Sequence, residues 1–218
     1  MPKRAAQDFV ARAARSAEQA AAHAAELIAD GSTLLTHSRS STVLAAFVRA
    51  RRAGRRFRVI ATESRPLMEG RALAEALAGE SVDVTFITEG AAALVLPRVS
   101  RVMVGADRVT AGWLVNKIGT RMIVLAAREC GVKVTALCDT SKFIAATPDA
   151  PEAVRDPNEL WPDAPPPVEV VNRYFEPTPL DYFDGVVTED GWLAPHEAGR
   201  RAAGYPLSQS LLAALGAA

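Results

Sequence analysis

Short apolar segments recur along this chain, and most of them are followed by a polar turn and a segment with helical spacing. The segments with the character of β-strands are residues 33–36, 58–61, 82–87, 101–104, 133–138 and 185–188. Strands with continuous apolar character are typical of parallel sheets, because helices cover both faces of such a sheet. We therefore expect an α/β fold: a Rossmann-like parallel sheet of about six or seven strands with helices on both faces and a short helical N-terminal segment.

The length and composition favour a single domain. At 218 residues, 49% of them hydrophobic, the chain can bury a substantial core. We expect a helical segment over residues 1–30 and one Rossmann-like domain over residues 31–218. The prolines between Pro148 and Pro167 follow no regular period, which predicts an irregular exposed excursion. Beyond it, the sequence predicts a short strand at residues 168–171, a polar loop at 172–180 and a C-terminal helix around 211–215.

The charge balance and the N-terminal sequence argue against several classes of function. Lys and Arg together number 25, and so do Asp and Glu, which leaves no electrostatic basis for binding nucleic acid or a membrane surface. Residues 1–19 carry charges throughout and lack the apolar run of a signal peptide. No segment approaches the ~18 consecutive apolar residues of a membrane span. We therefore expect a cytoplasmic protein.

The cysteines and histidines do not form a metal site. Their spacing matches no zinc motif, and Cys130 and Cys138 lie in or beside apolar segments. We expect both cysteines to be buried, in a reducing compartment. No Gly-x-Gly-x-x-Gly motif follows the first strand, and no Walker-type or Gly-x-Ser-x-Gly motif occurs. The sequence therefore predicts neither a metal nor an organic cofactor.

Two of the predicted strands end in polar turns. Asp107 lies in the turn after residues 101–104, and Lys142 lies in the turn after residues 133–138. Since ligands bind beyond the carboxyl ends of parallel strands, we expect both side chains at a ligand site. A carboxylate in this place can act as a general acid or base. The alternative is that Asp107 pairs with Arg108 or stabilises its own turn.

A polar loop is predicted at residues 112–120, between the strand that precedes Asp107 and the next helix. The loop contains Asn116 and Lys117, and Thr120 is expected to cap the helix. An amide and an ammonium group beside a helix start suit a phosphorylated small molecule better than a solvated surface.

A hydroxyl-rich turn, residues 37–42, separates the first predicted strand from another helix. Backbone N–H groups at a helix start bind anions, so Ser40 and Ser41, with the neighbouring Arg39, are candidate phosphate ligands. Alternatively, Ser40, Ser41 or Thr42 only caps the helix, which is a common role for these residues. Both interpretations stay open at this point.

Two arginines lie near the start of the helix predicted after residues 58–61. Arg65 and Arg71 flank this start, and Pro66 is expected in the first turn. An arginine beside a helix N-terminus can bind phosphate through two parallel hydrogen bonds. Alternatively, Arg65 pairs with Glu63 or Glu69 at the surface.

Five motifs can be recognised in order between roughly residues 30 and 197. They are LLTHSRSSTVL, ATESRPLMEGRALAEAL, GADRVTA with LVNKIGT, DTSKF, and FEPTPLDYFDGVVTE. With these motifs the chain resembles a superfamily that comprises the alpha, beta and delta subunits of eukaryotic translation initiation factor 2B and related sugar-phosphate isomerases. Those isomerases act on methylthioribose 1-phosphate and ribose 1,5-bisphosphate. The resemblance implies a phosphorylated small-molecule substrate and a homodimer built on a Rossmann-like domain.

The resemblance also implies roles for individual residues. Asp107 matches the catalytic acid of the isomerases, and Asn116 and Lys117 match the pair that holds the substrate. Ser38 stands where the isomerases carry a catalytic cysteine, so Asp107 and Ser38 are the expected catalytic residues. The residues expected to bind substrate are those of the phosphate-side motif, Glu63, Arg65 and Arg71, together with Arg39, Ser40, Ser41, Asn116, Lys117 and Lys142.

The chain departs from the isomerase pattern in two places. A serine hydroxyl is a far weaker acid than a thiol, which titrates near ~8.5 when free, so Ser38 lacks the acid–base chemistry of a cysteine. Cys138 is an alternative acid–base group at the same sheet edge, although cysteines in strands usually pack in a core. The superfamily enzymes also carry a larger N-terminal helical domain with an Arg-Gly-Ala phosphate loop, and residues 1–30 contain no such sequence.

Two functional hypotheses follow. The first is an aldose–ketose isomerase-like enzyme that acts on a sugar 1-phosphate, and Asp107, Asn116 and Lys117 favour it. The second is a non-catalytic protein, either an initiation factor 2B-like regulatory subunit or a sensor of a sugar phosphate or nucleotide. Ser38 and the short N-terminal segment favour the second hypothesis.

Overall fold

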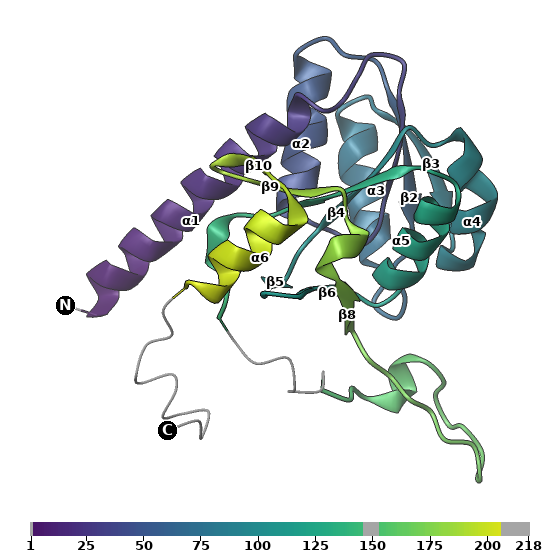
Figure 1. The fold of residues 1–218 in the computed structure, drawn as a ribbon. Helices are drawn as coiled ribbons and strands as arrows, with labels where there is room; N and C mark the ends of the chain where they lie inside the picture. The colour runs from purple at the N-terminus through teal and green to yellow at the C-terminus, as the bar shows by residue number, and fades with distance from the viewer. Residues whose placement is uncertain (1, 146–152, 206–218) are drawn as a thin grey trace.

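The main element of the structure, a computed structural model that describes residues 2–145 and 153–205, is a seven-stranded sheet in the order β10-β9-β7-β4-β1-β2-β3 (Figure 1). The strands are β1 (Thr33–Thr36), β2 (Arg58–Thr62), β3 (Asp83–Ile87), β4 (Arg101–Gly105), β7 (Lys133–Leu137), β9 (Gly185–Thr188) and β10 (Gly191–Leu193). Neighbours pair in parallel except β10, which runs antiparallel to β9. The predicted parallel α/β sheet is confirmed.

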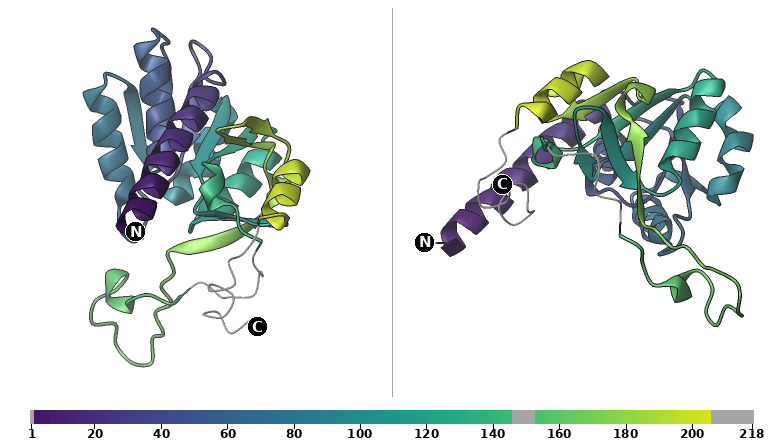
Figure 2. Two further views of the ribbon diagram at one scale, coloured as in Figure 1. Left: turned by 90° about the vertical axis from the view of Figure 1, so that its left-hand side faces the viewer. Right: turned by 60° about the horizontal axis from the view of Figure 1, so that its bottom comes forward.

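Helices cover both faces of this sheet, as Figure 2 shows. On one face lie α1 (Pro2–Ala25), α2 (Ser41–Arg52) and α3 (Glu69–Gly79), and on the opposite face lie α4 (Ala92–Val95), α5 (Thr120–Glu129) and α6 (Pro195–Ala203). Short 3-10 helices are η1 (Glu89–Ala91), η2 (Leu96–Arg98), η3 (Thr140–Lys142), η4 (Pro157–Glu159) and η5 (Leu180–Tyr182). None of the helices in the described ranges combines the length and the apolar character that crossing a membrane requires.

The core consists of two apolar layers, one on each side of the sheet. Successive strand residues point to opposite faces, so Leu34 of β1 packs toward α2 while Leu35 packs toward α5. In β4, Met103 packs on the face covered by α2, and Val102 packs on the face covered by α5. This two-sided burial explains why the strand sequences are apolar without alternation. Each fully buried leucine contributes roughly 1.5–3 kcal/mol to the stability of the fold.

A second, antiparallel sheet lies beyond the carboxyl ends of the main strands. Its order is β5 (Arg108–Val109), β6 (Trp113–Lys117) and β8 (Phe175–Pro179). The loop predicted at residues 112–120 is therefore mostly a strand, and the loop predicted at 172–180 contains another. Both predictions were wrong because β6 pairs with a strand about sixty residues away in sequence, for instance Asn116 with Glu176. Such pairing leaves no local turn signal.

The two prolines of β8 explain why the sequence did not predict this strand. Pro177 and Pro179 cannot donate backbone hydrogen bonds, so a segment that contains both argues against a central strand. β8 is an edge strand, because β6 is its only partner in the described sheet. An edge strand tolerates proline where the missing N–H group would have faced away from the ladder.

Residues 153–174 form an arm that extends away from the body of the molecule (Figure 1). The arm folds back on itself through an isolated bridge between Val154 and Arg173 and through η4. The strand predicted at residues 168–171 is absent from the described arm, since Val168 and Val171 are exposed and pair with no strand. The exposed excursion predicted between Pro148 and Pro167 is present in its described part, from residue 153 onward. The helix predicted at 211–215 lies outside the described residues.

Two smaller predictions were also wrong. Pro66 precedes α3, which begins only at Glu69, because the turn after β2 closes through a hydrogen bond from the N–H of Met68 to the carbonyl of Ser64. Cys130 is exposed, because it follows the last residue of α5 at the C-terminal end of the helix. Cys138 is buried, as expected.

The close contact between α3 and β2 predicts a sharp difference between two glycines of one helix. A Cβ atom at Gly70 would lie 1.8 Å from the carbonyl oxygen of Thr62, whereas one at Gly79 would meet nothing within 4 Å. Gly70→Ala is expected to lower the free energy of unfolding by about 1–3 kcal/mol through overpacking. Gly79→Ala is expected to raise it by up to about 1 kcal/mol, because alanine restricts the unfolded chain. Urea titration of both variants checks this, and equal effects would contradict the packing of α3.

Candidate functional site

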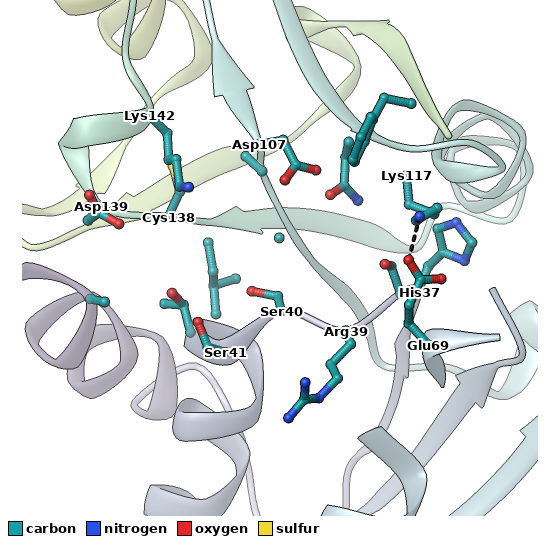
Figure 3. Close-up of a pocket in the computed structure, with 18 residues that line it drawn as sticks. His37, Arg39, Ser40, Ser41, Glu69, Asp107, Lys117, Cys138, Asp139 and Lys142 are labelled. Carbon is teal, nitrogen blue, oxygen red and sulfur yellow. Dashed lines mark ion pairs between the residues drawn. The ribbon is translucent and has the colours of Figure 1, made fainter. Parts of the chain in front are cut away.

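A polar cavity of about 310 Å³ opens at the carboxyl edge of the main sheet, where the small sheet meets it (Figure 3). Eight of the residues singled out in the sequence line it: Ser38, Arg39, Ser40, Ser41, Asp107, Asn116, Lys117 and Lys142. The other three, Glu63, Arg65 and Arg71, do not line it. Glu63 is half-buried, while Arg65 and Arg71 are exposed. The structure therefore brings the four predicted strand-end clusters together but leaves the two arginines of the phosphate-side motif outside.

The start of α2 forms one wall of the cavity. The Ser40 hydroxyl accepts the N–H of Val43 at 3.3 Å and caps the helix. Ser40, Ser41 and Thr42 also line the cavity, so capping and anion binding are compatible in this turn. The first N–H groups of a helix have no partner within the helix. A Cβ atom at Gly105 would lie 2.7 Å from the Cβ of Ser40, so only glycine lets β4 approach this turn.

The start of α5 is already occupied by a carboxylate. Glu176 accepts the N–H of Gly119 at 2.7 Å and that of Arg121 at 2.8 Å. Thr120 is not the N-cap that we predicted. Gly119 holds the cap position in a left-handed conformation with φ of 100°. The sequence could not reveal this arrangement because Glu176 comes from β8, and its consequence is that α2 offers the free anion-binding helix start.

Asn116 and Lys117 are held rigidly at the end of β6. The amide of Asn116 donates to the Thr120 hydroxyl at 2.9 Å, and that hydroxyl donates to the Lys117 carbonyl at 2.6 Å. The Lys117 ammonium is buried, with 3% of its side chain exposed, and lies 2.5 Å from a carboxylate oxygen of Glu69. A buried ammonium needs such a partner, because losing its hydration is costly.

Glu69 is a residue of the cavity that the sequence does not reveal. The sequence suggests only a surface ion pair between Glu69 and Arg65, but Glu69 is the first residue of α3 and lines the cavity. Its Oε1 atom pairs with Lys117, while Oε2 is buried and has no hydrogen-bond partner among the described residues. The local signal for this residue is a carboxylate in the first turn of the helix that follows β2. A buried carboxylate oxygen without a donor is a place for a hydrogen-bond donor on a ligand.

His37 lines the cavity and is buried, with 1% of its surface exposed. Its Nε2 donates to the carbonyl of Ile118 at 2.8 Å, and its Nδ1 lies 2.6 Å from the Thr62 hydroxyl, which donates to it. Burial lowers the pKa of His37, and it outweighs the Ile118 hydrogen bond and the charge of Glu89, 3.7 Å away, which raise that pKa. The imidazole is therefore neutral.

Two serines adopt left-handed backbone conformations beside His37. Ser38 has φ of 66° and Ser64 has φ of 65°, a conformation that costs a non-glycine residue roughly 1–2 kcal/mol. The N–H of Ser38 donates to the Ser64 hydroxyl at 2.8 Å, and the N–H of Ser64 donates to Glu89 at 2.6 Å. These bonds hold the turn that carries Ser38 into the cavity wall.

Asp107 lies on the turn after β4, with its N–H donating to the Val115 carbonyl at 2.9 Å. Figure 3 shows its carboxylate above Ser40, between the sides of the cavity that carry Lys142 and Lys117. This position is open to a bound molecule and close to solvent, since Asp107 is exposed. A proton can therefore pass between Asp107 and a ligand.

Cys138 lines the cavity but does not offer a thiolate. Burial raises the pKa of its thiol far above the ordinary value, and the charges of Asp139 and Glu189 raise it further. The thiol therefore stays protonated at neutral pH, which removes the support for Cys138 as a substitute acid–base group. Within the described ranges, no cluster of three or more His, Cys, Asp or Glu side chains suits a metal ion.

A model of the Initiation factor 2 subunit family matches residues 2–195. The chain is 34% identical over 203 residues to a ribose 1,5-bisphosphate isomerase of Pyrococcus furiosus, an alignment that covers 89% of this chain and 63% of that protein. It is 36% identical over 193 residues to a 5-deoxyribose 1-phosphate isomerase of Moorella thermoacetica, which covers 79% of this chain and 55% of that protein. This chain thus spans less than two thirds of the length of either isomerase.

A solved structure supports the same relationship. The translation initiation factor eIF-2B of Pyrococcus horikoshii OT3 superposes with a TM-score of 0.80 at 34% identity. The superposition covers 87% of this chain and 68% of that one. The similarity therefore covers most of this chain, and it includes proteins with either of two names: isomerase or translation initiation factor.

The neutral, buried state of His37 predicts how stability depends on pH. Its pKa is lowered in the folded protein, so the unfolded chain takes up the proton first as the pH falls. The contribution of neutral His37 to the free energy of unfolding should be fully present above about pH 6.5. Below that pH it should fall by up to about 1.4 kcal/mol per pH unit, until the pKa of His37 in the folded protein is reached. Urea titrations of the wild type and of His37→Gln between pH 5 and 7 check this. Parallel pH dependences in the two proteins would contradict it.

Proposed function

The chain belongs to the Initiation factor 2 subunit family, and we propose that it binds a phosphorylated sugar and interconverts its aldose and ketose forms. The observation that carries the proposal is the cavity itself, in which the start of α2, the buried Lys117 and the carboxylate of Asp107 face one space. These are a phosphate site, a hydroxyl-binding group and an acid–base group within reach of one small molecule.

The phosphate binds at the start of α2. The N–H groups of Ser41 and Thr42, the partial positive charge of the helix end and the hydroxyl-rich turn all favour an anion there. Lys142 and Arg39 add positive charge at the same cavity. Glu63, Arg65 and Arg71 do not line this cavity, so we do not include them among the phosphate ligands that we propose here.

The sugar hydroxyls contact Asn116, Lys117 and Glu69. The Asn116 amide and the Lys117 ammonium are fixed by Thr120 and Glu69, so they orient a hydroxyl without losing much freedom on binding. This is the arrangement expected for a pair that holds a substrate, and the names of the two isomerases fit it.

Asp107 is proposed as the acid–base residue. In the isomerisation of a cyclic aldose 1-phosphate, the hydrogen on C2 moves to C1, and the proton of the C2 hydroxyl ends on the former ring oxygen. A carboxylate beside the sugar can carry that second proton. Ser38 is proposed as its partner, in the place where the resemblance implies a cysteine. A serine hydroxyl does not ionise near neutral pH, so turnover is expected to be slow.

A second candidate is a sensor that binds the same sugar phosphate without converting it. Ser38 is the observation that favours this function, together with the similarity to eIF-2B of Pyrococcus horikoshii. The two candidates share the cavity and differ only in turnover. Binding of a sugar phosphate without formation of the ketose would therefore select the sensor.

We also propose a homodimer in the cytoplasm. The arm exposes Val154, Trp161, Val168 and Val171, which supports contact with a second copy. The two cysteines are free, as in proteins of reducing compartments. Neither nucleic acid nor a membrane is a proposed partner.

Replacing Asp107 by Asn is expected to abolish most of the turnover. Ribose 1-phosphate, 5-deoxyribose 1-phosphate, methylthioribose 1-phosphate and ribose 1,5-bisphosphate would be followed by NMR for conversion to the ketose. Loss of an acid–base group lowers the rate by about 10²–10⁴-fold. The melting temperature of the variant should stay close to that of the wild type, because Asp107 is exposed. Equal turnover by Asp107→Asn would rule out this role for Asp107.

Replacing Lys142 by Gln is expected to weaken the binding of these sugar phosphates. A charged hydrogen bond contributes about 1.5–3 kcal/mol, which corresponds to a loss of affinity of about tenfold to a hundredfold. Lys133→Gln is the matched control, because Lys133 is exposed at the opposite end of the main sheet, at the start of β7. Titration calorimetry measures both, and an equal loss in the two variants would show that only net charge matters.

A further inference from the structure

The turn that follows β7 carries Lys142, one of the phosphate ligands that we propose. This turn comprises Asp139 and the short helix η3. Figure 3 shows Lys142 and Asp139 on the side of the cavity opposite to Lys117. Lys142 is exposed, and none of the ion pairs among the described residues includes it. The position of its ammonium group therefore depends on the backbone of this turn.

A carboxylate outside the cavity holds this turn. Glu189, in the turn between β9 and β10, accepts the N–H of Thr140 at 2.9 Å and the Thr140 hydroxyl at 2.6 Å, one with each carboxylate oxygen. Hydrogen bonds to an ionised acceptor are stronger than those between neutral groups. Thr140 is the first residue of η3 and Lys142 is the last, so these bonds fix the segment that carries the lysine. Glu189 itself does not line the cavity.

The turn between β9 and β10 keeps Glu189 in place. The hydroxyl of Thr188 accepts the N–H of Asp190 at 3.2 Å and donates to the carbonyl of Gly191 at 3.4 Å. The carbonyl of Thr188 accepts a hydrogen bond from Nδ1 of His23 at 3.0 Å, which ties the turn to α1. Glu189 therefore projects from a closed turn, and it loses little freedom when it binds Thr140.

The charge of Glu189 opposes the binding of a phosphate nearby. Burial is the main cause of the raised pKa of Cys138, and the charges of Asp139 and Glu189 raise that pKa further, so the charge of Glu189 reaches the cavity wall. Two more carboxylates, those of Asp107 and Asp139, line the cavity itself. Like charges repel each other, so Glu189 disfavours an anion by its charge alone. Any gain in phosphate affinity from Glu189 must therefore come from the geometry that it imposes.

We propose that Glu189 is a positioning residue for the phosphate site: by holding Thr140, it places the Lys142 ammonium beside the phosphate at the start of α2. The inference rests on the proposed function and adds to it a residue from outside the cavity. Glu189 touches neither the sugar nor the phosphate, so it acts only through the turn that it holds. The phosphate then has two supports, the first N–H groups of α2 and a lysine that is held by the turn between β9 and β10.

The variant Glu189→Gln tests the proposal, because charge and geometry predict opposite results. The loss of a negative charge alone should strengthen the binding of a phosphate. Glutamine, however, turns one acceptor into a donor that faces a donor of Thr140, which releases the turn. The affinity for the four sugar phosphates named above is therefore expected to fall about fivefold or more, as measured by titration calorimetry. Asp190→Asn is the matched control: it removes a charge from the next residue, which pairs with Arg201, and should not weaken binding.

A double-mutant cycle shows whether Glu189 acts through Lys142. In a Lys142→Gln background, Glu189→Gln should change the affinity by less than about twofold, because the ammonium group that it positions is gone. A merely structural role would lower the affinity equally in both backgrounds. Thr140→Val removes the hydroxyl but keeps the N–H, so it should reproduce part of the loss, about twofold to threefold. This variant decides the question if Glu189→Gln does not fold.

The possible outcomes separate the inference from the proposed function. A loss of affinity in Lys142→Gln, with none in Glu189→Gln and Thr140→Val, overturns the inference and leaves sugar-phosphate binding intact. Equal losses from Glu189→Gln in the two backgrounds, or an equal loss in Asp190→Asn, also overturn it. Failure of all four compounds to bind the wild type overturns the proposed function and the inference with it.

Discussion

The buried imidazole of His37 holds together the sheet edge on which the cavity is built. It joins the end of β1 to Thr62 at the end of β2 and to Ile118 between β6 and α5, three segments that are far apart in sequence. Both ring nitrogens take part in these bonds in the neutral form, so the arrangement depends on an uncharged ring. The turn that carries Ser38 and Ser40 begins at the next residue, and the cavity wall therefore depends on this one side chain.

The main sheet could be predicted because its strands carry their own signal. Leu34 and Leu35, like Met103 and Val102, are apolar in succession since helices cover both faces. The small sheet carries no such signal. Its strands β6 and β8 are brought together only by the complete fold, and prolines interrupt β8. Sequence patterns therefore predict the main sheet, whose strands are encoded locally. They do not predict the small sheet, whose strands β6 and β8 are far apart in the sequence.

The residues of the cavity also differ in how well the local sequence predicts them. Asp107 and Lys142 follow apolar strands directly, so their place at the sheet edge could be predicted. Glu69 acquires its role only through Lys117, which is distant in sequence, and no local pattern marks that pair. The structure also begins α3 at Glu69, three residues after Pro66. This later start places the carboxylate at the cavity and leaves Arg65 on the exposed turn.

Strand β8 contributes both to the cavity wall and to the start of α5, so its position in the small sheet is constrained from two sides. Phe175 lines the cavity, and the next residue, Glu176, holds the N–H groups at the start of α5. Neighbouring strand residues point to opposite sides, so one short strand serves a binding surface with one face and a helix with the other. Any shift of β8 by a single residue would exchange these two side chains. The arm that precedes β8 can therefore change in length without affecting the cavity, whereas a shift of the strand would remove Phe175 from the cavity wall and Glu176 from the start of α5 together.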